Sequence, residues 1–492
     1  MSVQQIEGTL ELSREEMQSL GYRVVDTLVE HFDRLRDQSV IGVSSRPALE
    51  KALREPLPIQ GMAPEDLVRQ LQADVFSNMA HVAHPRFFAL IPSPSNFVSV
   101  MADTLAAGFN ANVTSWLTAS GPAMIEHVTL DWLRQLCGLP PTAGGLFVSG
   151  GSMANLTALA VARHIQLADD IANATIYLSD QTHFSVERGL RVLGFHATQI
   201  RKLPSDSAFR LPLAALRDVV RADRAAGKEP FCIVANAGTT NTGAIDPLDD
   251  LADFAREQGL WLHADGAYGA AATLSERHAV LLAGLGRVDS LTFDPHKWLF
   301  QPYEIGCVLV RDARWLPATF HHLPEYLRDT HRGEEEMNFG FSGIQLSRGF
   351  RALKLWMSLK TFGLEAFQDA IDRGFALAEI ADKTLRQSPC WEVITPAQMG
   401  IVTFRYRPAA AASADCDALN QRIVDAMQTD GFAFLSSTTL RGQTVLRLCT
   451  INPRTTDDDI RETIARLAHF GATLSDEQFI MGGASSVSAG AA

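Results

Sequence analysis

The sequence predicts an α/β fold in which helices cover a largely parallel β-sheet. Short β-rich runs alternate with helical stretches through the middle of the chain, and this alternation is typical of βαβ units. The length of 492 residues allows about three structural units and a large buried core. Open sheets of this type bind ligands beyond the carboxyl ends of their strands, so chemistry is expected in the residues just after each run.

Residues 1–84 are predicted to form an N-terminal helical segment. Apolar residues recur at helical spacing over residues 12–35, and a second helical stretch follows over residues 63–79. Ser13 is a candidate N-cap for the first helix. Two helices alone bury little apolar surface, so we expect the segment to pack on another domain or another subunit.

Residues 85–360 are predicted to form the large domain, with a mostly parallel seven-stranded sheet. Helical stretches such as Met153–Ala168 and Leu211–Ala226 separate most of its β-rich runs. The runs are Gly145–Ser149, Ala174–Leu178, Ala197–Leu203, Phe231–Ala235, Leu260–Ala264, Ser290–Phe293 and Gly306–Val310.

Residues 361–474 are predicted to form a small α+β C-terminal domain. A long helical segment leads into it, and strand candidates follow at Ile401–Tyr406, Phe432–Ser436 and Thr444–Cys449. A helix is expected at Asp457–Phe470. Residues 475–492 end in Gly, Ala and Ser, so we predict a disordered tail there.

Composition excludes several classes of protein. Lys and Arg number 43 against 56 Asp and Glu, and this net charge of -13 offers no basic footprint for nucleic acid or an anionic membrane. Six scattered cysteines without a Cys-x-x-Cys pair indicate reduced thiols. The chain has no run of about 18 apolar residues and no basic N-terminal region followed by an apolar stretch, so we expect a soluble cytoplasmic protein.

The first β-rich run ends in Ser149-Gly150-Gly151-Ser152, where a helix is predicted to begin. Glycines let backbone N–H groups approach an anion, and a helix N-terminus adds positive potential, so a phosphate fits this turn. Taken alone, the motif also suits an ordinary strand-to-helix turn. Gly150-x-Ser152-x-Ala154 further resembles a hydrolase nucleophile elbow whose second glycine is replaced.

The fifth run ends in an acidic residue, Asp265, flanked by small residues that include Ala267. A carboxylate at a strand end is well placed to reach a ligand. Taken alone, Asp265 also suits a salt bridge, or a metal site shared with His263. Because no third ligand is evident nearby, we predict no metal site.

The sixth run leads to Asp294-Pro295-His296-Lys297-Trp298. A lysine in this aromatic, largely apolar setting is expected to be paired or bonded, and burial is expected to depress its pKa. A lysine with a depressed pKa is a nucleophile towards carbonyls. Taken alone, Lys297 also suits a partly exposed surface position.

Together these features match the requirements of pyridoxal 5'-phosphate. The cofactor needs an anchor for its phosphate, a carboxylate that keeps its pyridine nitrogen protonated, and a lysine that holds its aldehyde as a Schiff base. The glycine turn, Asp265 and Lys297 supply these groups in chain order at strand ends. His183, after the second run, is placed to stack on the pyridine ring.

At these residues the sequence resembles the group II pyridoxal-phosphate decarboxylases, and within them the aromatic-L-amino-acid decarboxylase branch. The resemblance spans about residues 12–474 and implies the PLP-dependent transferase fold, fold type I. The motifs that carry it are His84-Pro85-Arg86-Phe87-Phe88, Ser179-Asp180-Gln181-Thr182-His183-Phe184-Ser185-Val186-Glu187-Arg188, Gly238-Thr239-Thr240, His263-Ala264-Asp265-Gly266-Ala267-Tyr268, Pro295-His296-Lys297-Trp298 and Phe350-Arg351-Ala352-Leu353-Lys354-Leu355-Trp356.

The resemblance implies roles for individual residues of the cofactor site. Lys297 resembles the Schiff-base lysine, Asp265 the partner of the pyridinium and His183 the ring-stacking histidine. Asp294 is a further cofactor-binding candidate, although animal members of the family have Asn at this position. The remaining expected contacts to the phosphate and the rest of the cofactor are Gly151, Ser152, His296, Thr240 and Ala267.

The resemblance also implies decarboxylation of an L-amino acid, most simply an aromatic one, to the amine and CO2. In the family the tyrosine that Tyr326 resembles protonates the carbanion, and members with Phe there produce aldehydes, so Tyr326 favours amine formation. Ser93 resembles a position that touches substrate. Phe88 and Trp116 are candidates for an apolar substrate pocket, although core packing explains them equally well. Ser347 resembles a position where plant relatives acting on phenolic substrates have Ser.

Other functions stay open at this point. An aromatic aldehyde synthase, or a decarboxylase of glutamate, aspartate or diaminobutyrate, would use the same cofactor. A serine hydrolase would use Ser152 as its nucleophile, but Lys297 would then have no role in the reaction. A non-catalytic homologue would act only as a binding or scaffolding protein. The resemblance further implies a homodimer with sites near the subunit interface.

Overall fold

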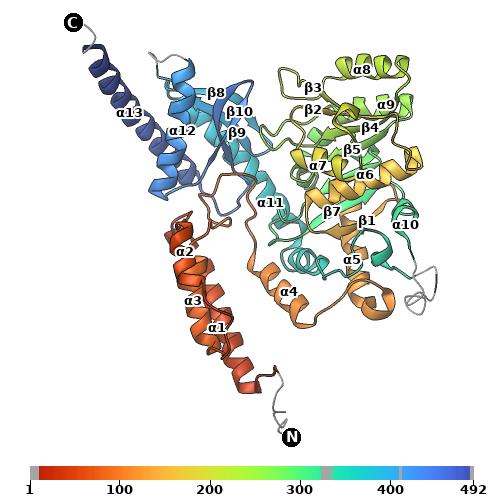
Figure 1. Cartoon of the computed structure of the whole chain (residues 1–492), viewed down its shortest axis with the longest axis horizontal. Coiled ribbons are helices and arrows are strands. Elements are labelled where there is room, and N and C mark those ends of the chain that lie inside the picture. Colours follow the sequence, from red (N-terminus) through yellow and green to blue (C-terminus); the bar gives the residue numbers. More distant parts are fainter. Residues whose placement is uncertain (1–9, 323–332, 334–335, 409–412, 488–492) are drawn as a thin grey trace.

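The computed structural model describes residues 10–322, 333, 336–408 and 413–487 (Figure 1). Over this range the chain has an N-terminal group of helices that reaches away from the body, a large α/β domain and a smaller α+β domain. The mostly parallel sheet and the small C-terminal sheet confirm the predicted fold class.

The N-terminal segment begins with helix α1 (Arg14–Asp33), which has a complete capping box. The Ser13 hydroxyl accepts the N–H of Glu16 (3.2 Å), and the Glu16 carboxylate accepts the N–H of Ser13 (2.8 Å). No residue of α1 is buried, and Met17, Tyr22 and Val29 are 54%, 64% and 49% exposed. The segment continues through a 3-10 turn (Leu35–Asp37), α2 (Arg46–Leu53), α3 (Pro64–Gln70) and a π-helical turn (Leu71–Phe76).

The large sheet has seven strands among the described residues, in the order β1-β7-β6-β5-β4-β2-β3. Its strands are β1 (Gly144–Val148), β2 (Ala174–Ser179), β3 (Ile200–Leu203), β4 (Glu229–Asn236), β5 (Trp261–Asp265), β6 (Ser290–Phe293) and β7 (Gly306–Val310). β7 lies between β1 and β6 and is antiparallel to both, whereas the other described pairings in this sheet are parallel. The connection from β6 to β7 therefore folds back over the carboxyl end of β6.

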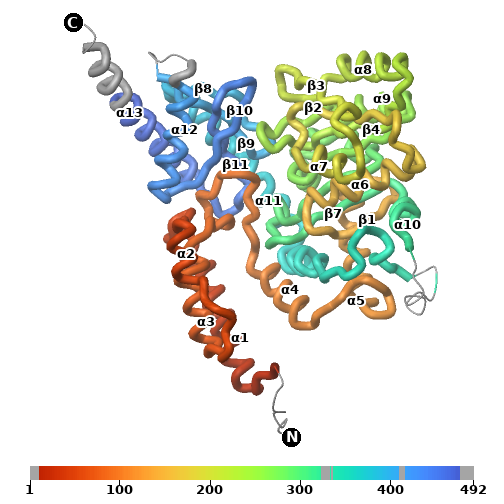
Figure 2. The backbone as a smooth tube through the Cα atoms, viewed as in Figure 1, coloured from red at the N-terminus to blue at the C-terminus, as the bar shows by residue number. Residues whose placement is uncertain are grey.

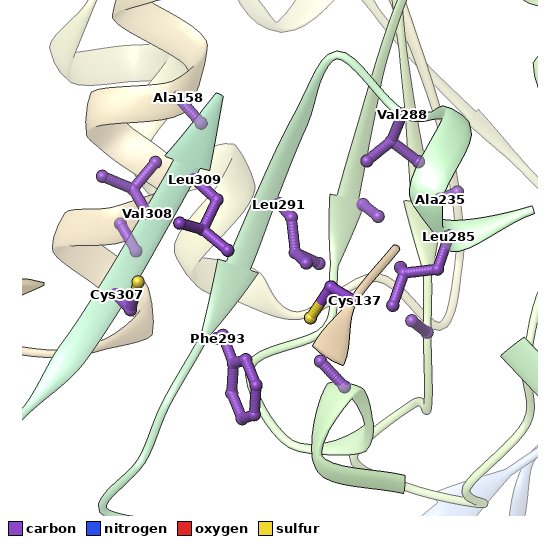
Figure 3. Close-up of a cluster of buried hydrophobic side chains, with 14 of the residues drawn as sticks. Cys137, Ala158, Ala235, Leu285, Val288, Leu291, Phe293, Cys307, Val308 and Leu309 are labelled. Atoms are coloured by element: carbon purple, nitrogen blue, oxygen red, sulfur yellow. The ribbon is translucent and has the colours of Figure 1, made fainter. Parts of the chain in front are cut away.

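Helices on both faces of this sheet complete the core. The helices of this domain are α4 (Phe97–Gly108), α5 (Trp116–Leu136), α6 (Gly151–Leu167), α7 (Phe184–Val192), α8 (Leu213–Ala225), α9 (Leu248–Gln258) and α10 (Trp315–Phe320). Figure 3 shows Leu291, Val308 and Leu309 of the central strands in one apolar cluster with Ala158 of α6. All six cysteines lie in described residues and are free, and five of them are buried.

The C-terminal domain contains a second sheet with the order β10-β11-β9-β8 among the described residues. Helix α11 (Ala352–Arg386) enters it and is kinked at Gly363, whose φ is +78°. The predicted domain boundary at residue 360 thus falls near a kink inside one long helix. The other elements are β8 (Trp391–Gln398), β9 (Ile401–Tyr406), α12 (Ser413–Asp430), β10 (Ser436–Leu440), β11 (Gln443–Cys449) and α13 (Asp457–Val487).

Two predictions for this part of the chain were wrong. The strand expected at Phe432–Ser436 is β10 at Ser436–Leu440, because a two-residue turn at Arg441 and Gly442 pairs β10 with β11 in an antiparallel hairpin. The tail predicted to be disordered from residue 475 instead continues α13 to Val487. Its first residues, 475–481, contain no Gly or Pro that would end the helix, whereas the Gly-, Ala- and Ser-rich stretch begins only at residue 482.

The start of the predicted large domain is hydrogen-bonded to the C-terminal domain. The N–H of Phe88 donates to the carbonyl of Phe434 (2.7 Å), and the N–H of Cys449 in β11 donates to the carbonyl of Phe88 (3.0 Å). Figure 2 shows this stretch passing beside the C-terminal sheet before it reaches α4. Residues around Phe88 therefore tie the N-terminal segment to the small domain.

None of the helices in the described part of the chain is long and apolar enough to cross a membrane.

Stability is expected to fall on acidification because of His84, which is fully buried. Burial and the nearby Arg86 guanidinium lower the pKa of His84 from 6.5 to about 4. The unfolded chain therefore binds the extra proton first as the pH drops below about 6.5, and the stability that neutral His84 contributes above that pH is lost towards pH 4. The loss amounts to about 3 kcal/mol.

This loss is measurable by urea unfolding of the wild type and His84→Gln at about pH 7 and about pH 4. Gln retains an acceptor for the N–H of Arg86, which donates to His84 Nδ1 (3.0 Å). The wild type should lose about 3 kcal/mol more than the variant over this range. Equal losses of unfolding free energy in the wild type and in His84→Gln would show that His84 does not titrate in this way.

Candidate active site

A cavity of about 390 Å³ lies beyond the carboxyl ends of β1, β2, β4, β5 and β6. This is the edge of the sheet at which ligands of open α/β folds bind. The cavity gathers residues that are far apart in the sequence but follow neighbouring strands. Its lining includes Gly150, Gly151, Ser152, Asn155, Gln181, His183, Ser185, Asn236, Thr239, Thr240, Asp265, Ala267, Tyr268, Asp294, His296 and Lys297.

The glycine turn after β1 forms one wall of the cavity. Helix α6 begins at Gly151, so its free backbone N–H groups and the positive end of its dipole face this wall. A β-carbon at Gly151 would lie 2.7 Å from Asp294 Oδ2, and one at Gly306 would lie 2.7 Å from Asp294 Oδ1. At Gly306 a β-carbon would also lie 2.4 Å from the α-carbon of Gly150, so both positions require glycine.

Ser152 is exposed beside this turn and lines the cavity. Among the described residues no hydrogen bond joins it to a histidine, whereas a hydrolase nucleophile needs a base within hydrogen-bond reach. His183 Nδ1 is instead 2.8 Å from Ser185 Oγ, and His296 Nδ1 is 3.4 Å from the backbone nitrogen of Ile305. The arrangement favours an anion-binding role for Ser152 over a hydrolase role.

Lys297 lies in the connection from β6 to β7 and points its amine at a buried carboxylate. Its Nζ atom is 3.0 Å from Asp294 Oδ2, and its side chain is 23% exposed. Burial alone lowers the pKa of Lys297, but the carboxylates of Asp294 and Asp265 outweigh it and raise that pKa above its ordinary value.

The expectation of a depressed lysine pKa was therefore wrong, because the sequence did not reveal that two carboxylates face the amine. Lys297 must give up a proton before it can attack a carbonyl, and its contact with Asp294 stabilises the protonated amine.

Asp265, at the end of β5, presents an oriented carboxylate to the cavity. Its Oδ1 atom accepts the N–H of Ala267 (3.1 Å), and its Oδ2 atom accepts the side-chain amide of Asn155 (2.9 Å). His263 is fully buried and bonds to Asn155 and Ser290 through its two ring nitrogens. No cluster of metal ligands occurs among the described residues, so nothing in that range supports the alternative of a metal site at Asp265.

His183 caps helix α7 and brings its ring to the cavity. Its Nδ1 atom is 2.8 Å from Ser185 Oγ. Burial lowers the pKa of His183 more than the Asp265 carboxylate raises it, so the neutral ring is favoured. A neutral, oriented imidazole suits stacking on a flat ligand.

Thr240, Ala267 and His296, which the family resemblance implies as cofactor contacts, also line the cavity. Asn155 and Ser185, which bind to Asp265 and His183 respectively, were not predicted from the sequence. Ser185 lies inside the recognised motif around His183, and Asn155 stands three residues after Ser152, so proximity to these motifs was the available signal.

The four residues predicted to bind substrate, Ser93, Phe88, Trp116 and Ser347, are not among the residues that line this cavity. The Ser93 hydroxyl donates to the carbonyls of His296 and Gln301 (3.1 Å to the latter) and so supports the lysine-bearing connection. Trp116 is half-buried at the start of α5, and Ser347 is exposed.

Phe88 is fully buried in the core of the C-terminal domain, so its predicted place in a substrate pocket was wrong. The sequence alone showed only that it is aromatic, not which sheet it packs on. Tyr326 lies outside the described residues.

Comparisons with known proteins agree with this geometry. Residues 47–407 match the pyridoxal-dependent decarboxylase conserved domain. The chain is 49% identical over 460 residues to an aromatic-L-amino-acid decarboxylase from Bacillus atrophaeus, covering 93% of this chain and 96% of that one. It is 29% identical to a phenylacetaldehyde synthase from Arabidopsis thaliana, covering 92% and 95%.

Solved structures share the whole fold. A structure of Oryza sativa TDC with PLP and tryptamine superposes with a TM-score of 0.90 at 28% identity, covering 95% of this chain and 99% of that one. A structure of Catharanthus roseus tryptophan decarboxylase in complex with L-tryptophan superposes with a TM-score of 0.89 at 27% identity, covering 95% and 100%.

Proposed function

The chain belongs to the pyridoxal-dependent decarboxylase family, and from this premise we propose that it decarboxylates an aromatic L-amino acid to the corresponding amine and CO2. The observation that carries the proposal is that one cavity gathers a lysine, a carboxylate and a glycine turn at a helix N-terminus. These are the groups that pyridoxal phosphate requires of a protein.

The residues present fit this cofactor. The turn at Gly151 has no room for a side chain and faces the start of α6, which suits a phosphate. We assign the phosphate to Gly151 and Ser152, with His296 beside them, and the aldehyde to Lys297. Thr240 and Ala267 would line the cofactor. When bound, the cofactor supplies an electron sink for the electrons released as the carboxylate leaves as CO2.

Three side chains around the cofactor would set the charge of its ring and the position of the groups that contact it. Asp265 would keep the pyridine nitrogen protonated, because its carboxylate is anchored through both oxygens by N–H donors. His183 would stack on the ring as a neutral imidazole. Asp294, in contact with the Lys297 amine, would hold that amine in place beside the cofactor.

The aromatic substrate class is supported by the 49% identity to the Bacillus atrophaeus aromatic-L-amino-acid decarboxylase. A panel of aromatic and non-aromatic L-amino acids, with CO2 and organic product both identified, tests the proposal. We expect amine and CO2 in equal amounts from at least one aromatic substrate. The proposal is overturned by aldehyde as the main product, which indicates an aldehyde synthase, or by turnover confined to non-aromatic substrates. It is also overturned by the absence of turnover, which indicates a non-catalytic homologue.

Tyr326 is proposed to deliver the proton that replaces the lost carboxylate, on the basis of its resemblance to the family's proton donor. Replacing it with Phe removes the hydroxyl and keeps the ring, so product should shift from amine towards aldehyde, ammonia and peroxide. Product analysis under air checks this, with Tyr22→Phe on exposed α1 as a matched control. An unchanged amine yield from Tyr326→Phe would refute the role.

We also propose that the protein acts as a cytoplasmic homodimer. The support is that α1 leaves Met17, Tyr22 and Val29 exposed, and that a second subunit offers a surface to cover them. The position of Trp116 and Ser347 away from the cavity is compatible with contributions across such an interface.

A further inference from the structure

A row of buried polar side chains leads through the large domain and ends on Asp265. Trp261 Nε1 is 2.8 Å from Ser290 Oγ, which is 2.8 Å from His263 Nδ1. His263 Nε2 is 2.9 Å from Asn155 Oδ1, and Asn155 Nδ2 is 2.9 Å from Asp265 Oδ2. All five side chains are buried, so water does not compete for these bonds.

The chemistry of the groups gives this row a single direction. The Asp265 carboxylate only accepts, so Asn155 turns its NH2 group to Asp265 and its oxygen, also an acceptor, to His263 Nε2. A neutral His263 therefore donates from Nε2 and accepts the Ser290 hydroxyl at Nδ1, while the Ser290 oxygen accepts from the indole N–H of Trp261. The imidazole then carries its proton on Nε2 and donates it to the Asn155 oxygen. Each member therefore donates to the next one towards the cavity.

Two observations support this assignment of protons. Burial lowers the pKa of His263 well below its usual value, more than the nearby Asp265 carboxylate raises it, so the ring is neutral and has one N–H. Thr292 Oγ1 also donates to the Asn155 oxygen (2.7 Å). With two donors on its oxygen, the Asn155 amide is held with its NH2 group towards Asp265.

The same NH2 group of Asn155 also contacts Ser185, the residue that binds the ring of His183. Asn155 Nδ2 is 3.1 Å from Ser185 Oγ, which is 2.8 Å from His183 Nδ1. One amide therefore contacts both the carboxylate assigned to the pyridine nitrogen and the serine that orients the stacking ring. Its amide plane is set by groups outside the cavity.

We propose that Asn155, oriented by the row Trp261-Ser290-His263, is a positioning residue that fixes the Asp265 carboxylate for the pyridine nitrogen of the cofactor. This inference rests on the proposed role of Asp265 and adds the residues that hold it. Asp265 Oδ1 is held by the Ala267 N–H, so loss of the Asn155 donor leaves the carboxylate anchored at one oxygen and free to rotate.

The decisive variant is Asn155→Asp, which keeps the shape and replaces the donor with an acceptor facing Asp265. We expect cofactor affinity to fall by about tenfold to a hundredfold, the range for one lost hydrogen bond to a charged group. In cofactor that is isotopically labelled at the pyridine nitrogen, the nuclear magnetic resonance signal should move towards that of the unprotonated ring. Asn155→Ala should change the cofactor affinity and the nitrogen signal in the same direction. It replaces Asn155→Asp in the experiment if that variant does not fold.

Thr292→Val is a graded comparison, because it removes one of the two donors to the amide oxygen but leaves the row from Trp261 intact. Its cofactor affinity should fall by no more than about threefold, clearly less than that of Asn155→Ala, with the nitrogen signal near that of the wild type. The inference is overturned if Asn155→Ala keeps wild-type affinity and signal, or if Thr292→Val loses as much affinity as Asn155→Ala, since packing would then explain the loss.

The failure of this inference is distinguishable from failure of the proposed function. Asp265→Asn, measured in the same way, reports on the proposed role of Asp265 itself. If Asp265→Asn loses the protonated nitrogen signal while the Asn155 variants keep it, only the role of Asn155 falls. If Asp265→Asn keeps the signal, the assignment of Asp265 falls as well.

Discussion

Lys297→Ala is expected to abolish decarboxylation, with turnover reduced by at least about ten-thousandfold. In the proposed function the amine of Lys297 is the nucleophile towards the cofactor's aldehyde, and His296, whose Nε2 atom is 3.7 Å from Asp294 Oδ2, offers only an imidazole in its place. Without the lysine, the covalent attachment and exchange step is lost. CO2 release under saturating substrate measures the effect.

A second measurement separates loss of chemistry from loss of folding. The visible absorption of the lysine-linked cofactor should disappear in Lys297→Ala, while the far-UV circular dichroism stays that of the wild type. Lys228→Ala, at an exposed position before β4, is the matched control and should retain activity within about twofold. Persistent absorption and turnover in Lys297→Ala would place the reactive amine elsewhere.

Asp265→Asn is expected to lower turnover by about a hundredfold or more while the fold remains intact. A charge-assisted hydrogen bond is worth about 1.5–3 kcal/mol, and each ~1.36 kcal/mol lost from the transition state is about tenfold in rate. The amide that replaces the carboxylate also places its NH2 group against the Asn155 NH2 group, or turns that group towards the Ala267 N–H.

The loss should appear in kcat more than in KM, because the charge on the pyridine nitrogen matters most as electrons move towards the ring. Steady-state kinetics with added cofactor checks this, and Asp218→Asn on the exposed face of α8 is the matched control. Near-normal turnover in Asp265→Asn would refute the assignment of Asp265.

Local sequence signals predicted the elements of the large domain closely. The apolar run Leu260–Ala264 corresponds to β5 at Trp261–Asp265, and Gly306–Val310 corresponds to β7 residue for residue. Each run is short, β-rich and bounded by a turn, so its type follows from neighbours in the chain. The antiparallel insertion of β7 between β1 and β6 was not predictable in this way, because strand order depends on which edges pair.

The sequence by itself determined which chemical groups the protein has at its strand ends: the glycine turn at Gly151, the carboxylate of Asp265 and the amine of Lys297. These groups stand in short motifs, and the rule that ligands bind at the carboxyl ends of strands places them at one edge. That inference needs only the order of strands and turns along the chain.

Only the tertiary structure decided how those groups act on one another. Asn155 and Asp265 are 110 residues apart, yet their side chains share a hydrogen bond. The two carboxylates that raise the pKa of Lys297, and the packing of Phe88 in the C-terminal core, were likewise set by contacts between distant segments. Distances and burial determine the strength of such interactions, and both arise only when the sheet, its helices and the small domain pack together.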